Sequence, residues 1–348
     1  MFEPMERTGL QDLHFWHDPE TGLQAIIAIH DTLRGPAIGG CRFISYPSID
    51  AAVHDATRLA QGMSYKSALA GLPHGGGKSV IIKPDHLDDR AALMRAFGRF
   101  VDSLGGRYIA AMDSGTQVTD MDQIAHTTPY VTCTSAMGDP SLSTALGVFS
   151  GIKASVHFLN QRQDLTGIHV AIQGLGHVGY AVARLLHRAG ATLTVTDIDS
   201  RLVHHACAEF DAQAVEPDDI YGVTADVFSP CGLGAILNAE TIRQLNCRCI
   251  AGSANNQLAD DQCGQALHDA GLLYAPDYLI NSGGLIFVAL QHANHHERLI
   301  RHKIGAIHDT LMALYQEADD TNQPTHRIAD QRAEAILKHA AQSQHQAA

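Results

Sequence analysis

The alternation of hydrophobic and polar positions predicts strands and helices in turn through the first half of the chain. Residues 13–17 and 23–30 are apolar and β-branched runs on either side of a glycine-containing turn, which is typical of two paired strands. Glycines and a proline predict irregular backbone at 33–42. Ser48 is a candidate N-cap for a helix with one apolar face, and that helix has Lys66 near its end.

The same reasoning extends the pattern to the middle of the chain. Asp88 can cap a second helix that ends at the glycine pair 105–106, and residues 107–112 form a short apolar strand. Thr119 is a candidate cap for a short helix. From Thr144 onward, an apolar helix is expected to link the two halves of the chain.

The clearest motif lies in the second half. A buried strand at 169–173 runs into a glycine turn, an amphipathic helix follows at 180–188, and a second strand at 191–196 ends at Asp197. An isolated glycine motif would be weak evidence, but strand, turn, helix, strand and acid in this order are typical of a dinucleotide-binding unit. The residues of the turn are Gly174, Leu175, Gly176, His177, Val178 and Gly179.

Each glycine of this turn has an expected task. Gly174 permits the tight turn, Gly176 lets the pyrophosphate approach, and Gly179 allows close packing of helix and strand. The free N–H groups at the helix N-terminus would bind the phosphates. Asp197 would accept hydrogen bonds from the ribose hydroxyls, which favours NAD over its 2′-phosphorylated relative, and Asp199 is the less favoured candidate for this contact. NAD is therefore the expected cofactor.

Strands and helices continue to alternate beyond this motif, so an α/β fold with a doubly wound sheet of the Rossmann type is predicted. Three segments each run from an apolar strand into a polar or glycine-rich turn, the position at which such sheets bind ligands. These segments are 226–234, 248–257 and 272–281. Residues 296–337 predict long helices, and a frayed tail is expected at 342–348.

A second candidate site lies in the first half, where an apolar stretch and three glycines separate Lys66 from Lys78. Residues 75–77 lack Cβ atoms, so their backbone can take positive φ and let a ligand approach. Lys78 opens the β-branched run 79–82, which predicts a buried strand, and partial desolvation there favours the neutral amine that acid–base chemistry uses. A phosphate-binding glycine loop is the alternative, but its spacing of glycine and lysine is not met.

Composition limits the functions that these motifs can serve. At 348 residues, with 45% hydrophobic and 18% charged residues, the chain is expected to form two ordinary globular domains. A net charge of −13 without a Lys/Arg cluster argues against a nucleic-acid partner, and no run approaches the roughly 20 apolar residues of a membrane helix. The first residues lack signal-peptide features and the seven cysteines are scattered, so a cytoplasmic protein with free thiols is expected.

The 22 histidines include His292, His295 and His296, which are close enough in sequence to raise a metal site as a hypothesis. No acidic or cysteine partner recurs beside them at ligand spacing. A solvated helix surface is therefore favoured for these three histidines, and no metal is expected.

The residues around the two lysines, M-x-x-K-x-A-x-x-x-x-x-x-G-G-G-K, resemble the amino-acid dehydrogenases related to glutamate, leucine, valine and phenylalanine dehydrogenase. The three later segments, with P-C-x-L-G, A-G-x-A-N-N-Q-L and A-P-D-Y-x-x-N-x-G-G, look like the family's cofactor-side segments in family order. The similarity spans nearly the whole chain and is closest to the leucine and valine branch. It implies a substrate-binding and oligomerisation domain at 1–140, a Rossmann-type NAD-binding domain at 141–330, and a C-terminal helix and tail at 331–348.

The resemblance also implies a role for particular residues. Lys66 would hold the substrate α-carboxylate, Lys78 would be the catalytic lysine, and Asp113 would exchange a proton with the amino group, although an acid at a strand end more commonly caps a turn. On the cofactor side the resemblance implies contacts from Thr144, Cys231 and Asn255, and a substrate contact from Asn256. Helix capping stays open as the alternative for Asn256 and for Asn281.

The function that the resemblance implies is reversible oxidative deamination of leucine, valine or isoleucine to the 2-oxo acid and ammonia, by a homo-oligomer. Members that bind glutamate have a lysine and a serine at the positions of Ile38 and Val288. An apolar pocket wall is therefore expected from Ile38, Ala111, Leu285 and Val288, beside the paired glycines Gly39 and Gly40.

Three departures from the family pattern bear on this function. The segment 134–141 is shorter than its glycine-rich equivalent, which affects the hinge, while Cys41 and Phe287 replace a usual threonine and asparagine and can reshape the pocket. The alternatives are a dehydrogenase for glutamate or for an aromatic amino acid such as phenylalanine, and a non-catalytic NAD-binding regulatory protein. Intact Lys66, Lys78 and Asp113 count against the last, because a mere NAD binder needs none of them.

Overall fold

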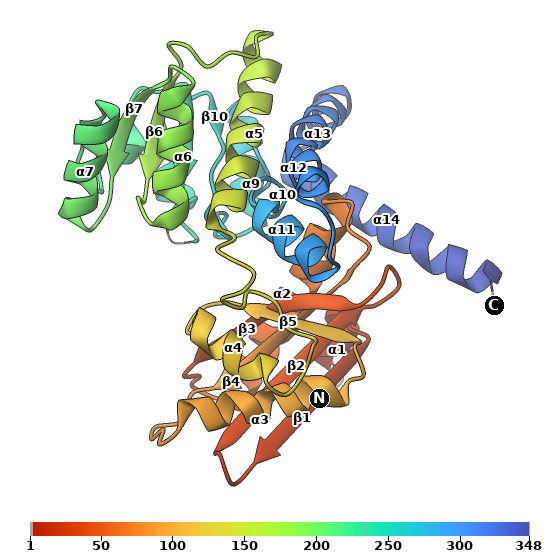
Figure 1. Ribbon diagram of the computed structural model, residues 1–348. Helices are drawn as coiled ribbons and strands as arrows, with labels where there is room; N and C mark the ends of the chain where they lie inside the picture. Colours follow the sequence, from red (N-terminus) through yellow and green to blue (C-terminus); the bar gives the residue numbers. More distant parts are fainter. Residues whose placement is uncertain (1–2, 233, 348) are drawn as a thin grey trace. The chain divides into compact units, whose positions relative to one another are not determined.

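The computed structural model describes residues 3–232 and 234–347 (Figure 1). The chain divides into two compact units, and each includes segments that are distant in sequence. The first unit comprises residues 1–139, 288–296 and 333–348, and the second comprises 140–287 and 297–332. An α/β fold with two such units is what the sequence predicts, although residues 288–296 and 333–348 group with the first unit rather than with the segments around them.

The first unit is built on a five-stranded sheet in the order β1-β2-β4-β3-β5. The strands are β1 (Asp12–Asp18), β2 (Leu23–Asp31), β3 (Ala37–Ile44), β4 (Gly75–Ile82) and β5 (Tyr108–Met112). β2 is antiparallel to β1 and β4, whereas β3 is parallel to both β4 and β5. The helices that lie within this unit are α1 (Glu3–Thr8), α2 (Ile49–Leu69), α3 (Arg90–Ser103) and α4 (Val118–Ala125).

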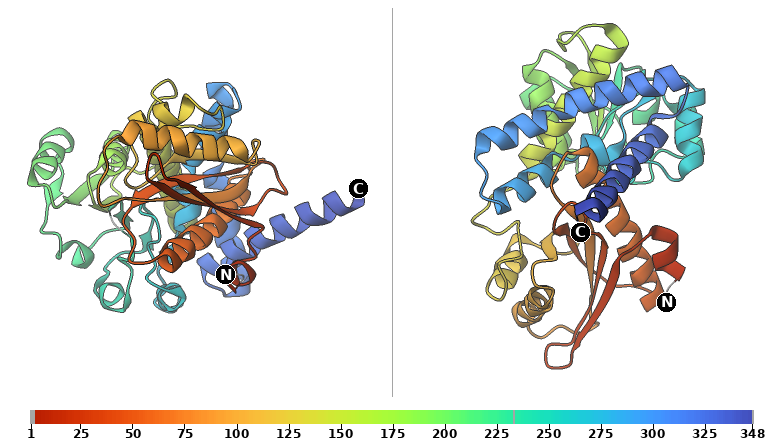
Figure 2. Two further views of the ribbon diagram at one scale, coloured as in Figure 1. Left: turned by 90° about the horizontal axis from the view of Figure 1, so that it is seen from below. Right: turned by 90° about the vertical axis from the view of Figure 1, so that its right-hand side faces the viewer.

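The two faces of this sheet are covered by different helices, and Figure 2 shows α2 and α3 on opposite sides of the strands. On one face, Ala52 and Ala56 of α2 pack with Ile26 of β2 and Val80 of β4. Side chains alternate along a strand, so Lys78 lies on the same face as Val80 and therefore on the α2 face. The sheet thus directs the candidate catalytic lysine toward α2.

The second unit contains a six-stranded parallel sheet in the order β11-β10-β9-β6-β7-β8. The strands are β6 (His169–Gln173), β7 (Thr192–Thr196), β8 (Gln213–Ala214), β9 (Val227–Pro230), β10 (Cys249–Ile250) and β11 (Leu273–Tyr274). Its helices include α5 (Ser141–Asn160), α6 (His177–Arg188), α7 (Ser200–Phe210), the 3₁₀ turn η1 (Ile220–Gly222), α8 (Ala239–Gln244), α9 (Asp261–Asp269), α10 (Asp277–Ile280), α12 (Glu297–Gly305) and α13 (Ile307–Thr321). Two further helices, α11 (Gly283–His292) and α14 (Thr325–Ala347), each have residues in both units.

The prediction of irregular backbone at 33–42 is confirmed for residues 33–36, which form a turn, and was wrong for 37–42, because residues 37–44 form β3 inside the sheet. Glycine is needed in this strand because the backbone of the neighbouring strand leaves no room for a side chain. A Cβ on Gly39 would lie 1.7 Å from the carbonyl oxygen of Gly77 on the neighbouring strand. Gly75 likewise needs no positive φ, since it begins β4, and a Cβ there would lie 1.8 Å from the carbonyl oxygen of Asp31.

Helix boundaries were predicted with errors of one to three residues. Ser48 caps α2 as expected, with its hydroxyl accepting from the backbone N–H of Ala51. Asp89, rather than Asp88, caps α3, and Gln117, rather than Thr119, precedes α4. The helices α5 and α6 begin at Ser141 and His177, which is earlier than Thr144 and Tyr180.

Two expectations about apolar and terminal segments were also wrong. Residues 342–347 of the predicted frayed tail are helical, since α14 continues to Ala347, and residue 348 lies outside the described residues. The expectation that no segment approaches the composition of a membrane helix fails for α5, whose 20 residues are long and apolar enough to cross a membrane. Half of α5's apolar window is buried within the protein, as in a core helix of a globular domain, so this is weak evidence for a membrane span.

Candidate active site

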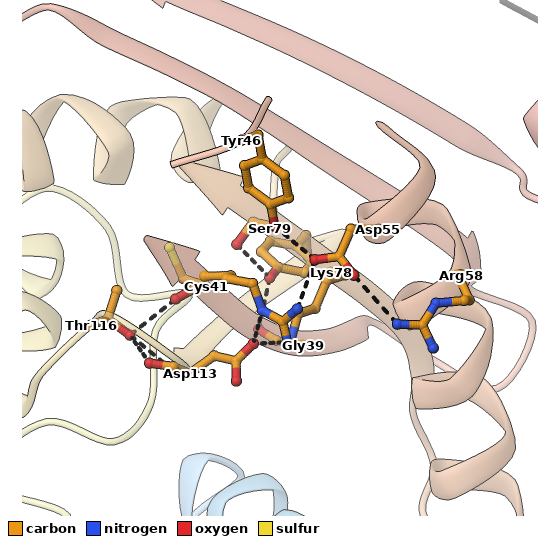
Figure 3. A network of polar contacts seen from close by, with 11 residues as sticks. Gly39, Cys41, Tyr46, Asp55, Arg58, Lys78, Ser79, Asp113 and Thr116 are labelled. Carbon is orange, nitrogen blue, oxygen red and sulfur yellow. Dashed lines mark hydrogen bonds and ion pairs between the residues drawn. The ribbon is translucent and has the colours of Figure 1, made fainter. Parts of the chain in front are cut away.

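Lys78 and Asp113 form an ion pair at the centre of the first unit. Lys78 lies in β4 and Asp113 directly follows β5, and the Lys78 Nζ donates to Asp113 Oδ2 (Figure 3). The Lys78 side chain is 7% exposed and the Asp113 side chain is 22% exposed. The two residues most central to the predicted chemistry are therefore in direct contact and largely shielded from water.

The backbone of Asp113 is fixed by the turn that follows β5. The Asp113 N–H donates to Thr116 Oγ1 at 2.9 Å, and Thr116 Oγ1 donates to the carbonyl oxygen of Cys41 at 3.0 Å. Burial alone would raise the pKa of Asp113, but the positive charges of Lys78 and Arg42 outweigh it and hold that pKa below its usual range. Asp113 is thus a carboxylate at neutral pH and can accept a proton.

Arg42, Asp55 and Tyr46 extend this ion pair, and sequence reasoning missed all three as site residues. Arg42 Nε lies 3.4 Å from Asp113 Oδ2, and Arg42 Nη1 donates to Asp55 Oδ2 at 2.7 Å. The hydroxyl of Tyr46 donates to the same oxygen of Asp55 at 2.7 Å. Arg42 lies two residues after Gly40 in β3 and so shares its face of the strand.

Some of the residues predicted for the pocket wall lie on the same face of the sheet as the Lys78–Asp113 ion pair, and others do not. A Cβ on Gly40 would lie 3.1 Å from Lys78 Nζ, so the absence of a side chain there leaves room at the lysine. Gly40 is paired with Ala111 across β3 and β5, which puts Ala111 on the same face. Ile38 is on this face too but is fully buried, and Gly39 lies against the backbone of β4.

The other predicted substrate residues lie on other elements of the chain. Lys66 lies in the last turn of α2, the helix that covers the Lys78 face. Val288 belongs to the first unit and is buried, with its carbonyl oxygen accepting from Thr132 Oγ1 at 3.4 Å. Leu285 and Asn256 belong to the second unit. For these four residues the substrate contact stays a prediction.

Of the two unusual residues of the pocket region, Cys41 lies away from the candidate catalytic lysine, and the effect of Phe287 on the pocket stays a prediction. Cys41 points to the face opposite Lys78, since it pairs with Ser79 across β3 and β4 and is fully buried. Burial raises the pKa of the Cys41 thiol to about 12, so it is a neutral core side chain. It therefore lies behind the Lys78 face rather than on it. Phe287 is the last residue of its segment in the second unit and is partly exposed.

The glycine turn of the second unit has the geometry that a dinucleotide pyrophosphate requires. Gly174 has a φ of +95°, and the space around a Cβ on Gly176 is empty to 4 Å. A Cβ on Gly179 would lie 2.0 Å from the carbonyl oxygen of Gly174, so the helix packs tightly on the turn. Gly176 provides no side-chain cap for α6, which leaves the first N–H groups of that helix available to an anion.

The strand order places this turn at a switch point of the sheet. β6 is flanked by β7 and β9, and its glycine turn meets the turn after β9, where a Cβ on Gly174 would lie 2.8 Å from the Gly232 nitrogen. Cys231 lies in that second turn, with its Cβ 3.0 Å from the position of a Cβ on Gly179. Ligands of open α/β sheets bind at such points. The residues present therefore fit a bound dinucleotide.

Asp197 and Asp199 take distinct positions beside the glycine turn. Asp197 Oδ2 accepts from the N–H of Leu175 at 2.6 Å, and Asp197 Oδ1 accepts from the N–H of Asp199 at 2.8 Å. Asp199 caps α7 and pairs with Arg201. A carboxylate has more lone pairs than these two bonds use, so the predicted contact of Asp197 with the ribose remains open to it.

Asn281 organises the remaining cofactor-side residues. Its Nδ2 donates to Asn255 Oδ1 at 2.8 Å and to the carbonyl oxygen of Ser253 at 3.1 Å, while its buried Oδ1 finds no partner among the described residues. Asn281 also ends α10, so the capping alternative holds for its backbone. Asn256 has a φ of +50° and lies between β10 and α9, where Asp260 is the N-cap, so it caps neither end of a helix. Thr144 Oγ1 lies 2.5 Å from the position of a Cβ on Gly284.

Within residues 3–232 and 234–347, no group of three or more His, Cys, Asp or Glu side chains could hold a metal ion. His292 ends α11, and its Nε2 lies 3.1 Å from the carbonyl oxygen of Pro129. His295 and His296 are exposed between α11 and α12, so they are loop residues rather than the helix surface that was expected.

Comparisons with known proteins agree with this geometry. The chain matches the model of the Glu/Leu/Phe/Val dehydrogenase dimerisation domain over residues 12–130 and that of Glutamate/Leucine/Phenylalanine/Valine dehydrogenase over 194–344. It is 48% identical to the leucine dehydrogenase of Geobacillus stearothermophilus over 342 residues, which cover 97% of this chain and 93% of that protein. The chain belongs to the glutamate, leucine, phenylalanine and valine dehydrogenase family.

Two further members of this dehydrogenase family show its range. The phenylalanine dehydrogenase of Bacillus thermotolerans is 43% identical, with 96% of this chain and 91% of that protein covered. The crystal structure of L-tryptophan dehydrogenase from Nostoc punctiforme is 41% identical, has a TM-score of 0.89, and covers 98% of this chain and 100% of that one. As a family member, the protein is an amino-acid dehydrogenase, an oxidoreductase that uses NAD. The family and cofactor predicted from the sequence are confirmed.

Proposed function

We propose that the protein catalyses the reversible oxidative deamination of a branched-chain aliphatic L-amino acid, with leucine, valine and isoleucine all accepted. The observation that supports this most directly is the buried ion pair of Lys78 and Asp113, because a protein that only binds NAD has no use for it. Similarity to a leucine dehydrogenase over nearly the whole of both chains supports the aliphatic substrate.

The first unit supplies the groups for the chemistry. Bound NAD would supply the acceptor for the hydride from the substrate Cα, and loss of that hydride would turn the amino acid into an iminium. Lys66 pairs with the substrate α-carboxylate and orients it. Lys78 in its neutral form takes a proton from the attacking water, and Asp113 passes a proton to the departing ammonia. The contact between Lys78 Nζ and Asp113 Oδ2 gives the proton a direct path between the two groups.

The second unit supplies the cofactor site in this proposal. The turn from Gly174 to Gly179 and the N-terminus of α6 hold the pyrophosphate, and Asp197 accepts from the ribose hydroxyls. Because a 2′-phosphate would face the like charge of Asp197, NAD is preferred over its phosphorylated relative. Thr144, Cys231 and Asn255 contact the cofactor, and Asn256 contacts the substrate amino group.

The nature of the substrate side chain follows from two apolar positions. Burying a glutamate carboxylate beside Ile38 and Val288 would leave the charge unpaired, at a cost of several kcal/mol. One methylene more or less in an apolar pocket changes binding by only ~1–3 kcal/mol. Rejection of glutamate is therefore strong, and discrimination among leucine, valine and isoleucine is weak.

An aromatic amino acid is the second candidate substrate. Relatives named for phenylalanine and tryptophan are 43% and 41% identical to this chain, against 43–48% for relatives named leucine dehydrogenase. Ala111 and Leu285 favour an aliphatic side chain over a ring, whereas Phe287 on α11 can reposition that wall. Pocket size, rather than charge, decides between these two substrate classes.

We further infer a cytoplasmic homo-oligomer, in which the first unit binds substrate and forms the contacts between copies. The match of residues 12–130 to a dimerisation domain supports this division of tasks.

A spectrophotometric panel of single L-amino acids with NAD, repeated with its 2′-phosphorylated relative, tests the proposal. Leucine, valine and isoleucine should reduce NAD with the highest kcat/KM, and the phosphorylated cofactor should give a much lower value. Glutamate turnover close to that of leucine would contradict the pocket assignment. A marked phenylalanine preference would replace only the aliphatic substrate, and equal use of both cofactors would show that Asp197 does not face the ribose.

A further inference from the structure

Lys78 and Asp113 are the inner end of a longer row of alternating charges. Asp113 Oδ2 accepts from Lys78 Nζ and from Arg42 Nε, and Asp55 Oδ2 accepts from Arg42 Nη1. Arg58 Nη2 donates to the other oxygen of Asp55 at 3.4 Å. The side chains are 7% exposed at Lys78 and 49% exposed at Arg58, so the row runs from the buried site to solvent.

Arg42 is anchored on the side away from Asp113. Its bond to Asp55 is 2.7 Å long, whereas its contact with Asp113 is 3.4 Å, and Tyr46 donates to the same oxygen of Asp55 (Figure 3). Asp55 lies on α2 and Tyr46 lies just beyond β3, so two parts of the fold fix the guanidinium. The rigid fork of arginine allows this, because Nε and Nη1 can meet two different carboxylates at once.

The protonation state of Asp113 depends on the charges that face it from the packed elements. On the Lys78 face these groups are Lys78 on β4 and Arg42 on β3, with Lys66 in the last turn of α2, the helix that covers this face; Cys41 on β3 and Tyr108 on β5 lie on the opposite face. Burial raises the pKa of Cys41 and Tyr108, so both are neutral. Lys78 and Arg42 are therefore the cations in contact with the carboxylate.

The proposed reaction removes one of these two cations, since Lys78 acts in its neutral form when water attacks. Burial opposes the charge of Arg42, but Asp113 and Asp55 outweigh it and raise the pKa of Arg42 above its ordinary value. Arginine therefore stays charged throughout the reaction. Arg42 is the cation that remains beside Asp113 when Lys78 has lost its proton.

We propose that Arg42 is a positioning residue for this reaction: anchored by Asp55 and Tyr46, it orients the Asp113 carboxylate and keeps it ionised while Lys78 is neutral. The inference rests on the function proposed above for Lys78 and Asp113. Arg42 contacts neither substrate nor cofactor in this assignment and acts through Asp113.

The test compares Arg42→Gln, Arg42→Lys and Asp55→Asn with the wild type, using leucine and NAD. Arg42→Gln should lower kcat by roughly 10- to 100-fold, as expected for a displaced catalytic group. It should also move the acidic limb of the kcat/KM pH profile to higher pH, because the Lys78–Asp113 pair holds its protons more tightly once the positive charge of Arg42 is gone. Arg42→Lys retains the positive charge, so the acidic limb of its kcat/KM pH profile should stay nearer that of the wild type. Its kcat should fall, because lysine lacks the fork that bonds both Asp113 and Asp55. Asp55→Asn should also lower kcat, since the guanidinium loses its anchor.

Arg107→Gln is the matched control. Arg107 pairs with Asp12 in the same sheet but precedes β5, whereas Asp113 follows that strand. This variant should keep the wild-type kcat and pH profile. Circular dichroism and NAD titration by fluorescence verify that each variant is folded and binds cofactor. If Arg42→Gln fails to fold, the kinetics of Arg42→Lys and Asp55→Asn test the role of Arg42.

The outcomes separate this inference from the proposed function. An active wild type with an unshifted acidic limb in Arg42→Gln, or a loss of thermal stability alone, overturns the role of Arg42 and leaves Lys78 and Asp113 in place. A wild type that turns over no amino acid overturns both. A limb that moves in Arg42→Gln but not in Arg107→Gln supports the inference.

Discussion

At the scale of single residues, a substitution of Lys78 can separate the chemical step from cofactor binding. Lys78→Ala should lower kcat by at least ~10²-fold, the low end for the loss of an acid–base group. NAD affinity should change little, because the glycine turn belongs to the other unit of the chain. Steady-state kinetics and NAD titration of the purified variant measure the two effects. A near-normal kcat would remove Lys78 from the mechanism.

His74, which directly precedes β4, gives the protein a pH-dependent stability. The residue is 6% exposed, and burial, with His292 and Arg34 adding to the effect, lowers its pKa to about 4. An unfolded histidine titrates near ~6.5, so between these values the unfolded state binds a proton that the folded state does not. This contribution to stability is therefore complete above the unfolded pKa and is lost as pH falls through the folded pKa.

A His74→Gln variant should show a shallower fall in the free energy of unfolding over this pH window, by roughly 1–3 kcal/mol. Urea denaturation at a series of pH values measures the slope. His86→Gln is the control, because the His86 side chain is 90% exposed and its removal should leave the slope unchanged. Parallel curves for the wild type and His74→Gln would show that His74 does not titrate in this range.

The residues of the site divide into those that a local pattern reveals and those that only the fold brings together. Lys78, Asp113 and the turn from Gly174 to Gly179 belong to short motifs, so the sequence predicted them. Arg42 and Asp55 are 13 residues apart on a strand and a helix, and Asp113 lies 71 residues beyond Arg42. No periodicity or spacing joins such residues, and their contact depends on the order of strands in the sheet.

At the scale of elements, the glycines of β4 have a structural role that the fold reveals and the local sequence pattern does not. The sequence indicated freedom of the backbone for a ligand, whereas the structure shows that α2 and β2 approach the strand too closely for side chains. A Cβ on Gly76 would lie 2.0 Å from the backbone nitrogen of Ser64 in α2. The prediction of irregular backbone was wrong at 37–42 for a related reason, because glycines that permit close strand packing look the same in sequence as glycines of a loop.

Gly76→Ala and Gly62→Ala test this explanation as a pair. The alanine at 76 must push α2 away, so the free energy of unfolding should fall by about 1–3 kcal/mol or more. A displaced α2 also moves Lys66, so the KM for the amino acid should rise. Gly62 lies in the interior of α2 with nothing near its Cβ position, and alanine there should stabilise the protein by ~0.4–1 kcal/mol. Denaturant melts of both variants provide the measurement. Equal stability of the two would contradict the packing argument.

At the scale of the whole molecule, the two units show why the fold class was more predictable than the boundaries between units. Repeated strand–helix alternation and the glycine motif identify a doubly wound sheet from local patterns alone. Residues 288–296 and 333–348 join the first unit through contacts with residues far away in sequence, such as the hydrogen bond from the Tyr65 hydroxyl to Glu334. Such contacts leave no mark in the local pattern.

The last prediction concerns assembly of the protein with copies of itself. β1 is an edge strand that pairs with β2 alone among the described strands, so one side of its backbone is open to pairing. Phe15 and Trp16 on β1 and Ile49 on α2 are exposed by 47%, 38% and 51%, and they line a groove of about 360 Å³. Large apolar side chains gathered at an open strand edge are typical of an interface between chains.

We therefore expect the purified wild type to be an oligomer by size-exclusion chromatography with light scattering, and Phe15→Glu to weaken its assembly. A buried glutamate at the interface would lose its hydration without a partner, which favours the dissociated chain. Leu299→Glu is the control, because Leu299 is also an exposed apolar residue but lies on α12 in the second unit. A wild type that is monomeric at micromolar concentration would refute the self-association. Equal assembly of Phe15→Glu and Leu299→Glu would place the interface on another surface of the chain.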